Sequence, residues 1–365
     1  MLKLKDIIRE IEKLAPLVFQ ENYDNSGLIT GNIDMEISGI LISLDAIEPV
    51  MDEAINRKCN LIIAHHPIIF SGLKSLTGKN YIEKTIIKAI KNDIAIYAAH
   101  TNLDNMYHGV NQKMAQKLKL KNTSILQPLK NTLKKIIVYV PQSHYEMVQQ
   151  AILNAGAGHI GNYSHCSFNT QGYGTFMPNE NAKPFIGEKN KIHIENEFKI
   201  EAVFIKDKQK EIIQAMKESH PYEEIAYEIM TLDNENQYIG AGLIGELENE
   251  LLPTEFLTLV QKEFKADGIR YTELEKKINR IALCGGSGSF LLPNAIAAGA
   301  DAFLTADFKY HQFFDANNKL MIVDIGHYES EQYTGEIFLN KISEKYPNFA
   351  VHLTSVNTNP IKYFK

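Results

Sequence analysis

The chain has 365 residues, of which 44% are hydrophobic and 22% are charged, and its formal net charge is −6. This is an ordinary globular composition, and the length allows a large core divided into two or three domains. The acidic balance, without any long block of Lys and Arg, argues against nucleic acid as a partner.

The cysteines and the N-terminal pattern indicate the cellular compartment. Cys59, Cys166 and Cys284 lie far apart without a CxxC pair, which argues against a disulfide framework and against a cysteine zinc site. Leu4 and Ile11 belong to an amphipathic helical pattern, which is unlike a signal peptide. No apolar run is long enough to span a bilayer. We therefore expect a protein of the reducing cytoplasm without a membrane partner.

The first part of the chain alternates between strand patterns and helix patterns. The expected elements are strands at 37–44, 61–64 and 94–99, and helices at 50–58, 80–92 and 105–118. Strands separated by helices of this length favour parallel pairing within a layered α/β sheet.

The pattern changes near residue 130. The expected elements here are a strand at 134–140, a helix at 143–155, a Gly-rich polar stretch at 156–187, a strand at 199–205, a helix at 207–219 with Asp207 as its N-cap, and a strand at 225–232. This β-α-β…β-α-β order is typical of a ferredoxin-like domain. The segment also has the usual size of a small domain.

The earlier pattern returns after residue 233. The expected elements are strands at 278–284, 302–305, 320–325 and 349–353, and helices at 291–298 and 337–346. We therefore predict an α/β fold with a discontinuous layered α/β core of two similar halves, 1–130 and 234–365. An inserted ferredoxin-like α+β domain at 131–233 interrupts this core.

Three of the expected strands end in polar residues that are good metal ligands. These candidates are His65 and His66 after 61–64, Asp104 after 94–99, and His327 and Glu331 after 320–325. Ligands bind at the carboxyl ends of the strands in open α/β sheets, and neutral imidazole is the commonest metal ligand. If a helix begins at His327, Glu331 lies on the same helix face. The shared position of the three segments predicts that their side chains meet.

Five nitrogen and oxygen ligands without a thiolate suit Zn, Mn, Fe or Ni and do not select among these metals. They are too many for one tetrahedral ion that keeps a water position. They suit two ions about 3.5–4 Å apart with a bridging carboxylate, for which Glu331 is the candidate. A water held between the ions would be the nucleophile. The sequence identifies no catalytic residue beyond these ligands.

Several other candidate functional residues could instead have a purely structural role. Any single histidine is more often structural than metal-bound, and His100 would either orient a ligand or form a strand-end hydrogen bond. The glycine-rich loop 285–288 would either cradle an anion or form a tight turn. Another strand end, which would line the same cleft, is surrounded by Asp301, Thr305, Asp307 and His311.

Four motifs resemble the GTP cyclohydrolase 1 type 2 homologue family, also called the Nif-three-like proteins. The motifs are Tyr23 to Leu28 (YDNSGL), His65 to Phe70 (HHPIIF), His100 to Asp104 (HTNLD) and Gly326 to Glu331 (GHYESE). They occur in the order of the family and cover both halves of the core. The resemblance implies a di-metal site at the same five residues, namely His65, His66, Asp104, His327 and Glu331.

The resemblance also implies an assembly and a cofactor. Two divalent metal ions per chain are expected, with zinc as the first choice and manganese, iron or nickel as alternatives. The expected assembly is a homohexameric ring whose metal sites face an internal cavity. The inserted domain, with the motif HPYEE at 220–224, resembles the family version that carries a domain similar to the PII and CutA proteins. Such a domain would cap the ring or sense a small-molecule ligand.

Two functions are compatible with these expectations. The first is a metal-dependent hydrolase, similar to a GTP cyclohydrolase, that acts on a nucleotide or similar small molecule through a metal-bridging hydroxide. The alternative is a non-catalytic metal-binding regulatory or scaffold ring with a ligand-sensing PII-like insert. Nucleic-acid handling through the ring cavity is a third hypothesis, which the acidic balance disfavours.

Overall fold

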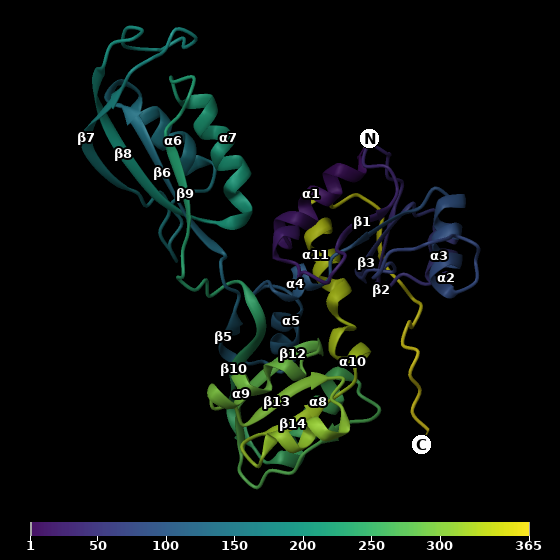
Figure 1. Cartoon of the computed structure of the whole chain (residues 1–365). Helices are drawn as coiled ribbons and strands as arrows, with labels where there is room; N and C mark the ends of the chain where they lie inside the picture. The colour runs from purple at the N-terminus through teal and green to yellow at the C-terminus, as the bar shows by residue number, and fades with distance from the viewer. Residues whose placement is uncertain (1, 365) are drawn as a thin grey trace. The chain divides into compact units, whose positions relative to one another are not determined.

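The computed structural model describes residues 2–364 as a mixed α/β protein with three β-sheets (Figure 1). Contacts divide the chain into two compact units. The first unit comprises Met1–Pro128 together with Gln237–Lys365, and the second comprises Leu129–Asn236. Among the described residues, no helix combines the length and the apolar character needed to cross a membrane.

The first sheet of the first unit has the strand order β1-β4-β3-β2-β15. Its strands are β1 (Gly27–Thr30), β2 (Ile40–Asp45), β3 (Leu61–His66), β4 (Ala95–Ala98) and β15 (Val351–Leu353). The pairings of β15 with β2, of β2 with β3 and of β3 with β4 are parallel, and β1 adds an antiparallel edge strand. The parallel pairing expected from the strand-helix alternation is therefore confirmed.

Helices cover both faces of this sheet because neighbouring residues of a strand point to opposite sides. Ile40 and Ile63 pack in the cluster that includes the apolar stripes of α1 and α11. Leu41 and Ile62 pack on the other face, in the cluster of α2 and α3. The bounds of these helices are Leu4–Leu14 for α1, Glu48–Asn56 for α2, Tyr81–Lys91 for α3 and Thr334–Lys345 for α11.

The second sheet of the same unit has the strand order β11-β14-β13-β12-β10-β5. Its strands are β5 (Lys121–Pro128), β10 (Gly240–Leu251), β11 (Arg270–Tyr271), β12 (Ile278–Ser287), β13 (Ala302–Ala306) and β14 (Met321–Asp324). β12, β13 and β14 are parallel, and the outer pairings are antiparallel. The first sheet thus contains four neighbouring parallel strands, and the second contains three.

Helices also cover the second sheet on both faces. The helices α5 (Val110–Lys117) and α8 (Pro253–Phe264) pack on one face through residues such as Met114 and Phe256. The helix α9 (Leu292–Ala297) packs on the opposite face, against strand residues such as Phe303. Two short helices, α4 (Thr101–Asp104) after β4 and α10 (His327–Glu331) after β14, begin where parallel strands end.

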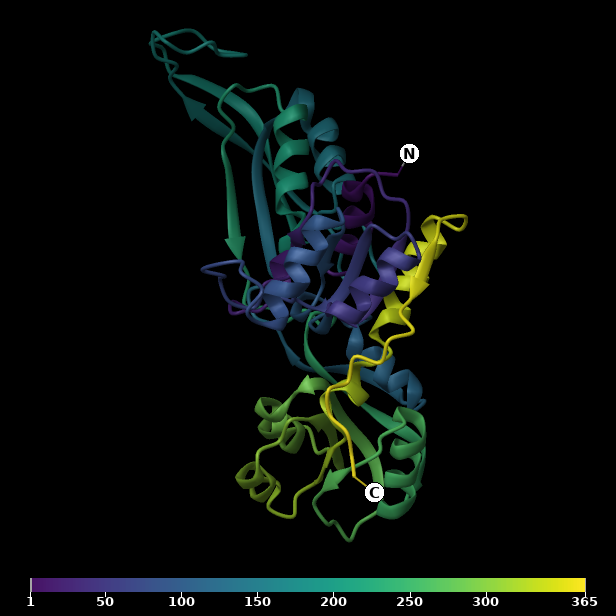
Figure 2. The ribbon, with the colours of Figure 1, turned by 90° about the vertical axis from the view of Figure 1, so that its right-hand side faces the viewer.

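The C-terminal segment, drawn in yellow, leaves β15 as an extended chain (Figure 2). Ser355 donates hydrogen bonds to Glu53 in the first half of the core. Further along, the side-chain amide of Asn359 donates to Glu329 of α10 at 3.0 Å. This segment therefore tethers the end of the chain to both halves of the first unit.

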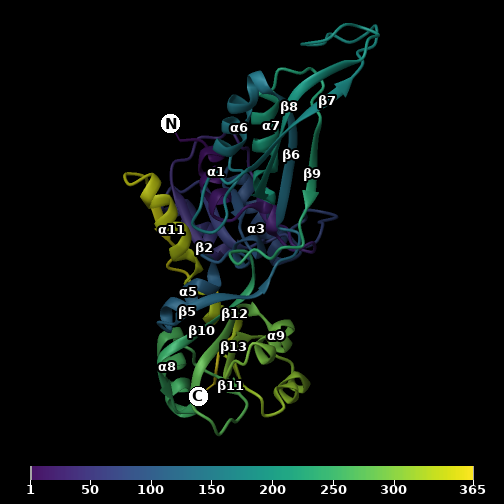
Figure 3. The same ribbon diagram turned by 90° about the vertical axis from the view of Figure 1, so that its left-hand side faces the viewer.

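The second unit contains a four-stranded antiparallel sheet with the order β7-β8-β6-β9. Its elements follow in the order β6 (Leu133–Pro141), α6 (Tyr145–Asn154), β7 (Phe168–Phe176), β8 (His193–Ile205), α7 (Gln209–Ser219) and β9 (Tyr227–Thr231). Figure 3 shows α6 and α7 on one face of this sheet. Val138 and Ile200 contact these helices in one buried cluster. Within the described part of this unit, no helix covers the opposite face.

Two local predictions are wrong. The helix expected at 105–118 is shorter, because a turn after α4 delays the start of α5 to Val110, with Gly109 as its N-cap. Asp207 does not cap a helix, because it lies in a 3-10 turn at Lys206–Lys208 that precedes α7. The 3-10 turn therefore occupies the position at which the sequence suggests an N-cap.

Several strands lie where the sequence pattern assigns none. β5 follows a lysine-rich stretch, β7 falls inside the Gly-rich stretch 156–187, and β10 begins with two glycines. Glycine and lysine are depleted in strands, so local preference argues against these segments. They form strands because partners on the sheet supply the backbone hydrogen bonds, as β10 does for β5.

Candidate metal centre

The structure brings all five predicted ligands together in the first unit. His65 and His66 end β3, Asp104 ends α4, and α10 carries His327 and Glu331. The ligand atoms of these five residues form two groups, each lying within 4.8 Å: one contains His66, His327 and Glu331, and the other contains His65, Asp104 and Glu331. A third group within the same distance joins His65 and His66 to His100. The two groups that contain Glu331 offer nitrogen and carboxylate oxygen atoms that could hold a metal ion.

Glu331 belongs to both groups, and its two carboxylate oxygens face different partners. Oε2 lies 2.9 Å from Nε2 of His66 and 3.1 Å from Nε2 of His327. Oε1 lies 3.8 Å from Nε2 of His65. The Glu331 side chain is only 3% exposed. The two oxygens of this buried carboxylate therefore face different groups of possible ligand atoms.

The second group contains two buried polar atoms without a partner. Nε2 of His65 and Oδ1 of Asp104 form no hydrogen bond in the structure, although they lie 3.5 Å apart. Buried polar atoms are almost always satisfied, and an exception requires an explanation. A cation between a neutral imidazole nitrogen and a carboxylate would satisfy both atoms. The residues present therefore fit a bound metal ion.

Hydrogen bonds orient the imidazole rings toward the centre of the cluster. Nδ1 of His66 lies 2.7 Å from Asp45, and Nδ1 of His327 lies 2.7 Å from Asp307. Nδ1 of the fully buried His65 lies 2.9 Å from the Ala99 carbonyl oxygen. Each of these acceptors favours the ring tautomer that carries its proton on Nδ1, so Nε2 is the atom that can bind a metal ion. This arrangement of a second partner behind each ring is typical of metal-bound histidines.

His100 lies beside this cluster and is held in the same way. Its Nδ1 is 2.8 Å from Asp24, which also accepts a hydrogen bond from the Thr101 backbone at 3.0 Å. The His100 ring centroid lies 5.2 Å from that of His65 and 5.4 Å from that of His66. Asp24 therefore belongs to the surroundings of the site and is not part of an isolated turn.

The charges of the cluster compensate one another in the absence of metal. Burial opposes protonation of His66, but Asp45 and Glu331 outweigh it and raise the pKa of His66 to about 10. Burial likewise opposes protonation of His327, and Glu331 and Asp307 raise its pKa to about 11. Burial raises the pKa of Asp104. Burial also acts against the charged form of Glu331, but the histidines lower its pKa.

The glycine-rich loop 285–288 supports Glu331 and does not present all its amides to an anion. The Gly285 amide donates to Asn111, and the Gly286 amide donates to the Ser330 hydroxyl, both at 2.9 Å. A Cβ atom at Gly286 would overlap Oε1 of Glu331, and the backbone φ of +60° there also favours glycine. The structure therefore explains Gly286 by the close approach of Glu331.

The cluster predicted around Asp307 is only partly correct. Asp307 contacts His327, and the Thr305 hydroxyl donates to the Gly286 carbonyl oxygen. Asp301 lies at the opposite end of β13, where it accepts backbone hydrogen bonds from Asn279 and Arg280. The exposed His311 contacts other aromatic rings and not the cluster. The prediction that Asp301 and His311 line the same cleft is therefore wrong.

Sequence reasoning missed the role of Asp45 and underestimated that of Asp24. Both look like turn residues, because Asp is common where strands end. Asp45 nevertheless ends β2, which is parallel to β3, so the rule that selected the other ligand segments applies to it too. For Asp24, no local pattern indicates its partner 76 residues away.

We predict that metal binding releases protons and weakens as the pH falls. Despite burial, neighbouring carboxylates raise the pKa of His66 to about 10 and that of His327 to about 11, so protons compete with a metal ion at these rings. A cation takes the place of the Nε2 proton, so affinity should drop about tenfold per pH unit for each proton released. Calorimetric titration with Zn²⁺ in buffers of different ionisation enthalpy measures this release. Heats that are independent of the buffer would contradict the prediction.

We also predict that Gly286→Ala weakens metal binding. The added Cβ displaces Glu331, and a displaced supporting contact typically costs about 10- to 100-fold in metal affinity. Gly299→Ala is the matched control, because Gly299 has a similar φ of +69° but open space around its Cβ. Metal content per chain, measured by elemental analysis, should fall in Gly286→Ala and not in Gly299→Ala. Equal metal content in both variants would refute the explanation for Gly286.

Comparisons with known proteins extend over almost the whole chain. A family model described as Duf34/NIF3 (NGG1p interacting factor 3) matches residues 2–360. The GTP cyclohydrolase 1 type 2 homolog of Bacillus subtilis (strain 168) is 38% identical over 366 residues, covering 98% of each chain. The homolog of Halalkalibacterium halodurans is 39% identical over 363 residues, also covering 98% of each chain.

Solved structures agree with this relationship. The crystal structure of a Bacillus cereus protein related to NIF3 has a TM-score of 0.86 and 38% identity, covering 100% of this chain and 99% of that chain. A Staphylococcus aureus protein has a TM-score of 0.79 and 30% identity, with the same coverage. The resemblance suggested by the four sequence motifs is confirmed, and the chain belongs to the Duf34/NIF3 family.

Proposed function

We propose that this protein holds two divalent metal ions per chain through His65, His66, Asp104, His327 and Glu331. The observation that carries the proposal is the position of Glu331, whose two oxygens face two different groups of ligand atoms. The unpartnered atoms of His65 and Asp104 support the second ion. Zinc is our first choice for a nitrogen and oxygen donor set, with manganese, iron and nickel as alternatives.

The reaction that we propose is metal-dependent hydrolysis of a nucleotide or similar small molecule. When bound, a pair of divalent cations supplies Lewis acidity and lowers the pKa of a coordinated water. GTP is the first substrate to examine, because relatives carry the name GTP cyclohydrolase 1 type 2 homolog. All other contributions to catalysis must come from the side chains around the cluster.

The pair of Asp24 and His100 is our candidate for proton transfer. Asp24 accepts from Nδ1 of His100 and thereby leaves Nε2 available to take up or return a proton. The His100 ring lies against the rings of His65 and His66. It forms no hydrogen bond with Asp104 or Glu331, the two carboxylates among the proposed ligands. Asp45 and Asp307 act by positioning the rings of His66 and His327.

A second function is favoured by the separate unit 129–236. Its element order and its sheet order β7-β8-β6-β9 support our proposal that 131–233 is an inserted ferredoxin-like domain similar to PII and CutA proteins. The rest of the chain, 1–130 and 234–365, then forms the metal-binding core. In this alternative the protein is a non-catalytic metal-binding scaffold, and the insert senses a small ligand.

We further propose that the chain assembles as a homohexameric ring in the cytoplasm. The three cysteines, Cys59, Cys166 and Cys284, are free thiols, which suits a reducing compartment. The native mass of the protein in solution tests the assembly directly.

We predict that the metal-loaded protein hydrolyses GTP or a phosphoester. This activity should depend on Glu331 for metal binding and, separately, on His100 for proton transfer. Glu331→Gln should lose metal and at least about 100-fold in kcat, because it removes a ligand from both groups. His100→Ala should keep its metal but lose about 100-fold in kcat, as expected for a proton-transfer group. The exposed His311→Ala is the control and should leave both unchanged.

Metal content by elemental analysis and product formation by chromatography are measured on the same samples. Full metal occupancy without turnover of any substrate would eliminate the hydrolase and leave the scaffold. Metal-depleted His100→Ala would reassign His100 from proton transfer to metal binding.

A further inference from the structure

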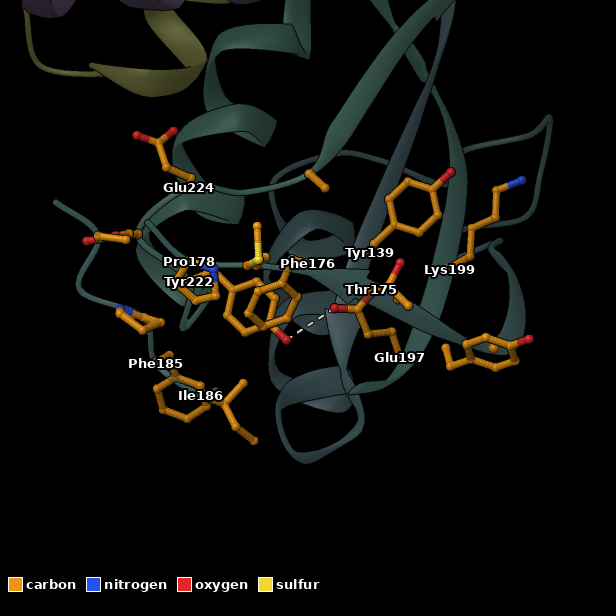
Figure 4. Close-up of a pocket in the computed structure, with 18 of the residues that line it drawn as sticks. Tyr139, Thr175, Phe176, Pro178, Phe185, Ile186, Glu197, Lys199, Tyr222 and Glu224 are labelled. Carbon is orange, nitrogen blue, oxygen red and sulfur yellow. Dashed lines mark hydrogen bonds between the residues drawn. The ribbon is translucent and has the colours of Figure 1, made fainter. Parts of the chain in front are cut away.

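A cavity of about 710 Å³ lies within the second unit (Figure 4). It is built on the sheet face that α6 and α7 leave uncovered, and the segments around Phe185 and Tyr222 close its sides. All of its lining residues fall between Tyr139 and Ala226, so the cavity does not involve the metal-binding core. Its volume is within the range of small-molecule sites, about 300–1,000 Å³.

Two glycines of β7 leave the floor of this cavity bare. Gly172 pairs with Glu197 of β8 in register, and a Cβ atom on Gly172 would meet nothing within 4 Å. A Cβ atom on Gly174 would overlap the carboxylate of Glu197, which lies over that glycine. The sequence Gly172-Tyr173-Gly174 therefore makes room for a ligand and admits Glu197 to the floor.

Aromatic rings form one wall of the cavity. The Tyr222 ring centroid lies 6.0 Å from that of Phe176 and 6.3 Å from that of Phe185. Figure 4 shows these rings on the same side of Glu197. Flat or cationic groups bind well to such walls, because the ring faces are electron-rich.

The charges around the cavity favour a cation. Glu197 accepts a hydrogen bond from the Tyr222 hydroxyl at 3.1 Å, and no Lys, Arg or His within residues 2–364 forms an ion pair with it. Lys199 pairs with Glu201 at 3.4 Å, and Glu201 also pairs with Lys135 at 3.4 Å. The charged side chains that line the cavity are Glu197, Glu223, Glu224 and Lys199. Glu197, Glu223 and Glu224 therefore outnumber Lys199 among the charged lining residues.

We propose that this cavity binds a small organic cation, whose flat apolar body lies against the Phe176 and Tyr222 rings and whose protonated nitrogen pairs with Glu197. Burial and the neighbouring Glu195 raise the pKa of Glu197, and the Tyr222 hydroxyl lowers it. A ligand cation would remove the cost of a partly buried carboxylate that has no counter-charge. An anionic ligand would meet the carboxylate of Glu197 and is disfavoured by the same argument.

Three flat aromatic probes of similar shape but different charge test whether the cavity prefers a cation. Benzamidinium is a flat cation, benzoate is its anionic counterpart, and benzyl alcohol is neutral. Binding to the metal-loaded full chain is measured by saturation-transfer NMR, which detects weak ligands. We expect benzamidinium to bind at least about tenfold more tightly than the other two, as one charge-assisted hydrogen bond implies.

Variants locate the binding in the cavity. Glu197→Gln removes the charge but keeps an oxygen for Tyr222, and it should weaken benzamidinium about tenfold. Gly172→Leu should abolish binding, because its side chain enters open space in the cavity without a backbone clash. Glu228→Gln is the matched control, since Glu228 is an exposed carboxylate of β9 outside the lining. Thermal unfolding establishes that all three variants remain folded.

Equal binding of benzamidinium and benzoate, or unchanged binding in Glu197→Gln and Gly172→Leu, would overturn the proposal. Light scattering provides a further criterion. If no probe binds and Gly172→Leu changes the native mass, the face is a contact between copies of the chain and the proposal fails. None of these measurements depends on metal chemistry, so the proposed hydrolase and the proposed cation site succeed or fail separately.

Discussion

A buried carboxylate must be compensated by nearby positive charge, because water no longer stabilises it. The candidate metal centre contains the buried Glu331 and the half-buried Asp104, beside the fully buried His65 and the half-buried His66 and His327. Nε2 of His66 and Nε2 of His327 lie 2.9 Å and 3.1 Å from Glu331, while the Oδ1 atom of Asp104 has no hydrogen bond. Two cations would compensate both carboxylates at once, and the other features of the site follow from this requirement.

The proposed ligands could be selected from the sequence because they obey a simple rule of sheet geometry. Apolar runs that alternate with helices become parallel strands, and polar residues at their carboxyl ends meet at one edge. β3 and β14 each end in such residues, but they belong to different sheets, so the rule selects the ligand residues of each sheet. His66 and Glu331 come within 2.9 Å, although 265 residues separate them, because the ends of the two sheets meet at the cluster. The one-turn spacing of His327 and Glu331 also matches the observed α10.

The remaining features depend on contacts that a local pattern does not contain. Asp45 looks like a turn residue, and only the pairing of β2 with β3 reveals it as the partner of His66. Gly286 looks like part of an anion-binding loop, but the approach of Glu331 explains it. β7 has a Gly-rich sequence that disfavours a strand, yet it is held by β8 and forms the floor of a cavity. Tertiary contacts override local preference at each of these positions.

Crystals of the protein soaked with Zn²⁺ and measured at the zinc absorption edge would show whether Glu331 lies between two cations. We predict two anomalous peaks per chain, one between His66, His327 and Glu331 and the other between His65, Asp104 and Glu331. Glu331 should contact both peaks, with one oxygen toward each. A single peak enclosed by all the ligands, or peaks that do not touch Glu331, would contradict the account.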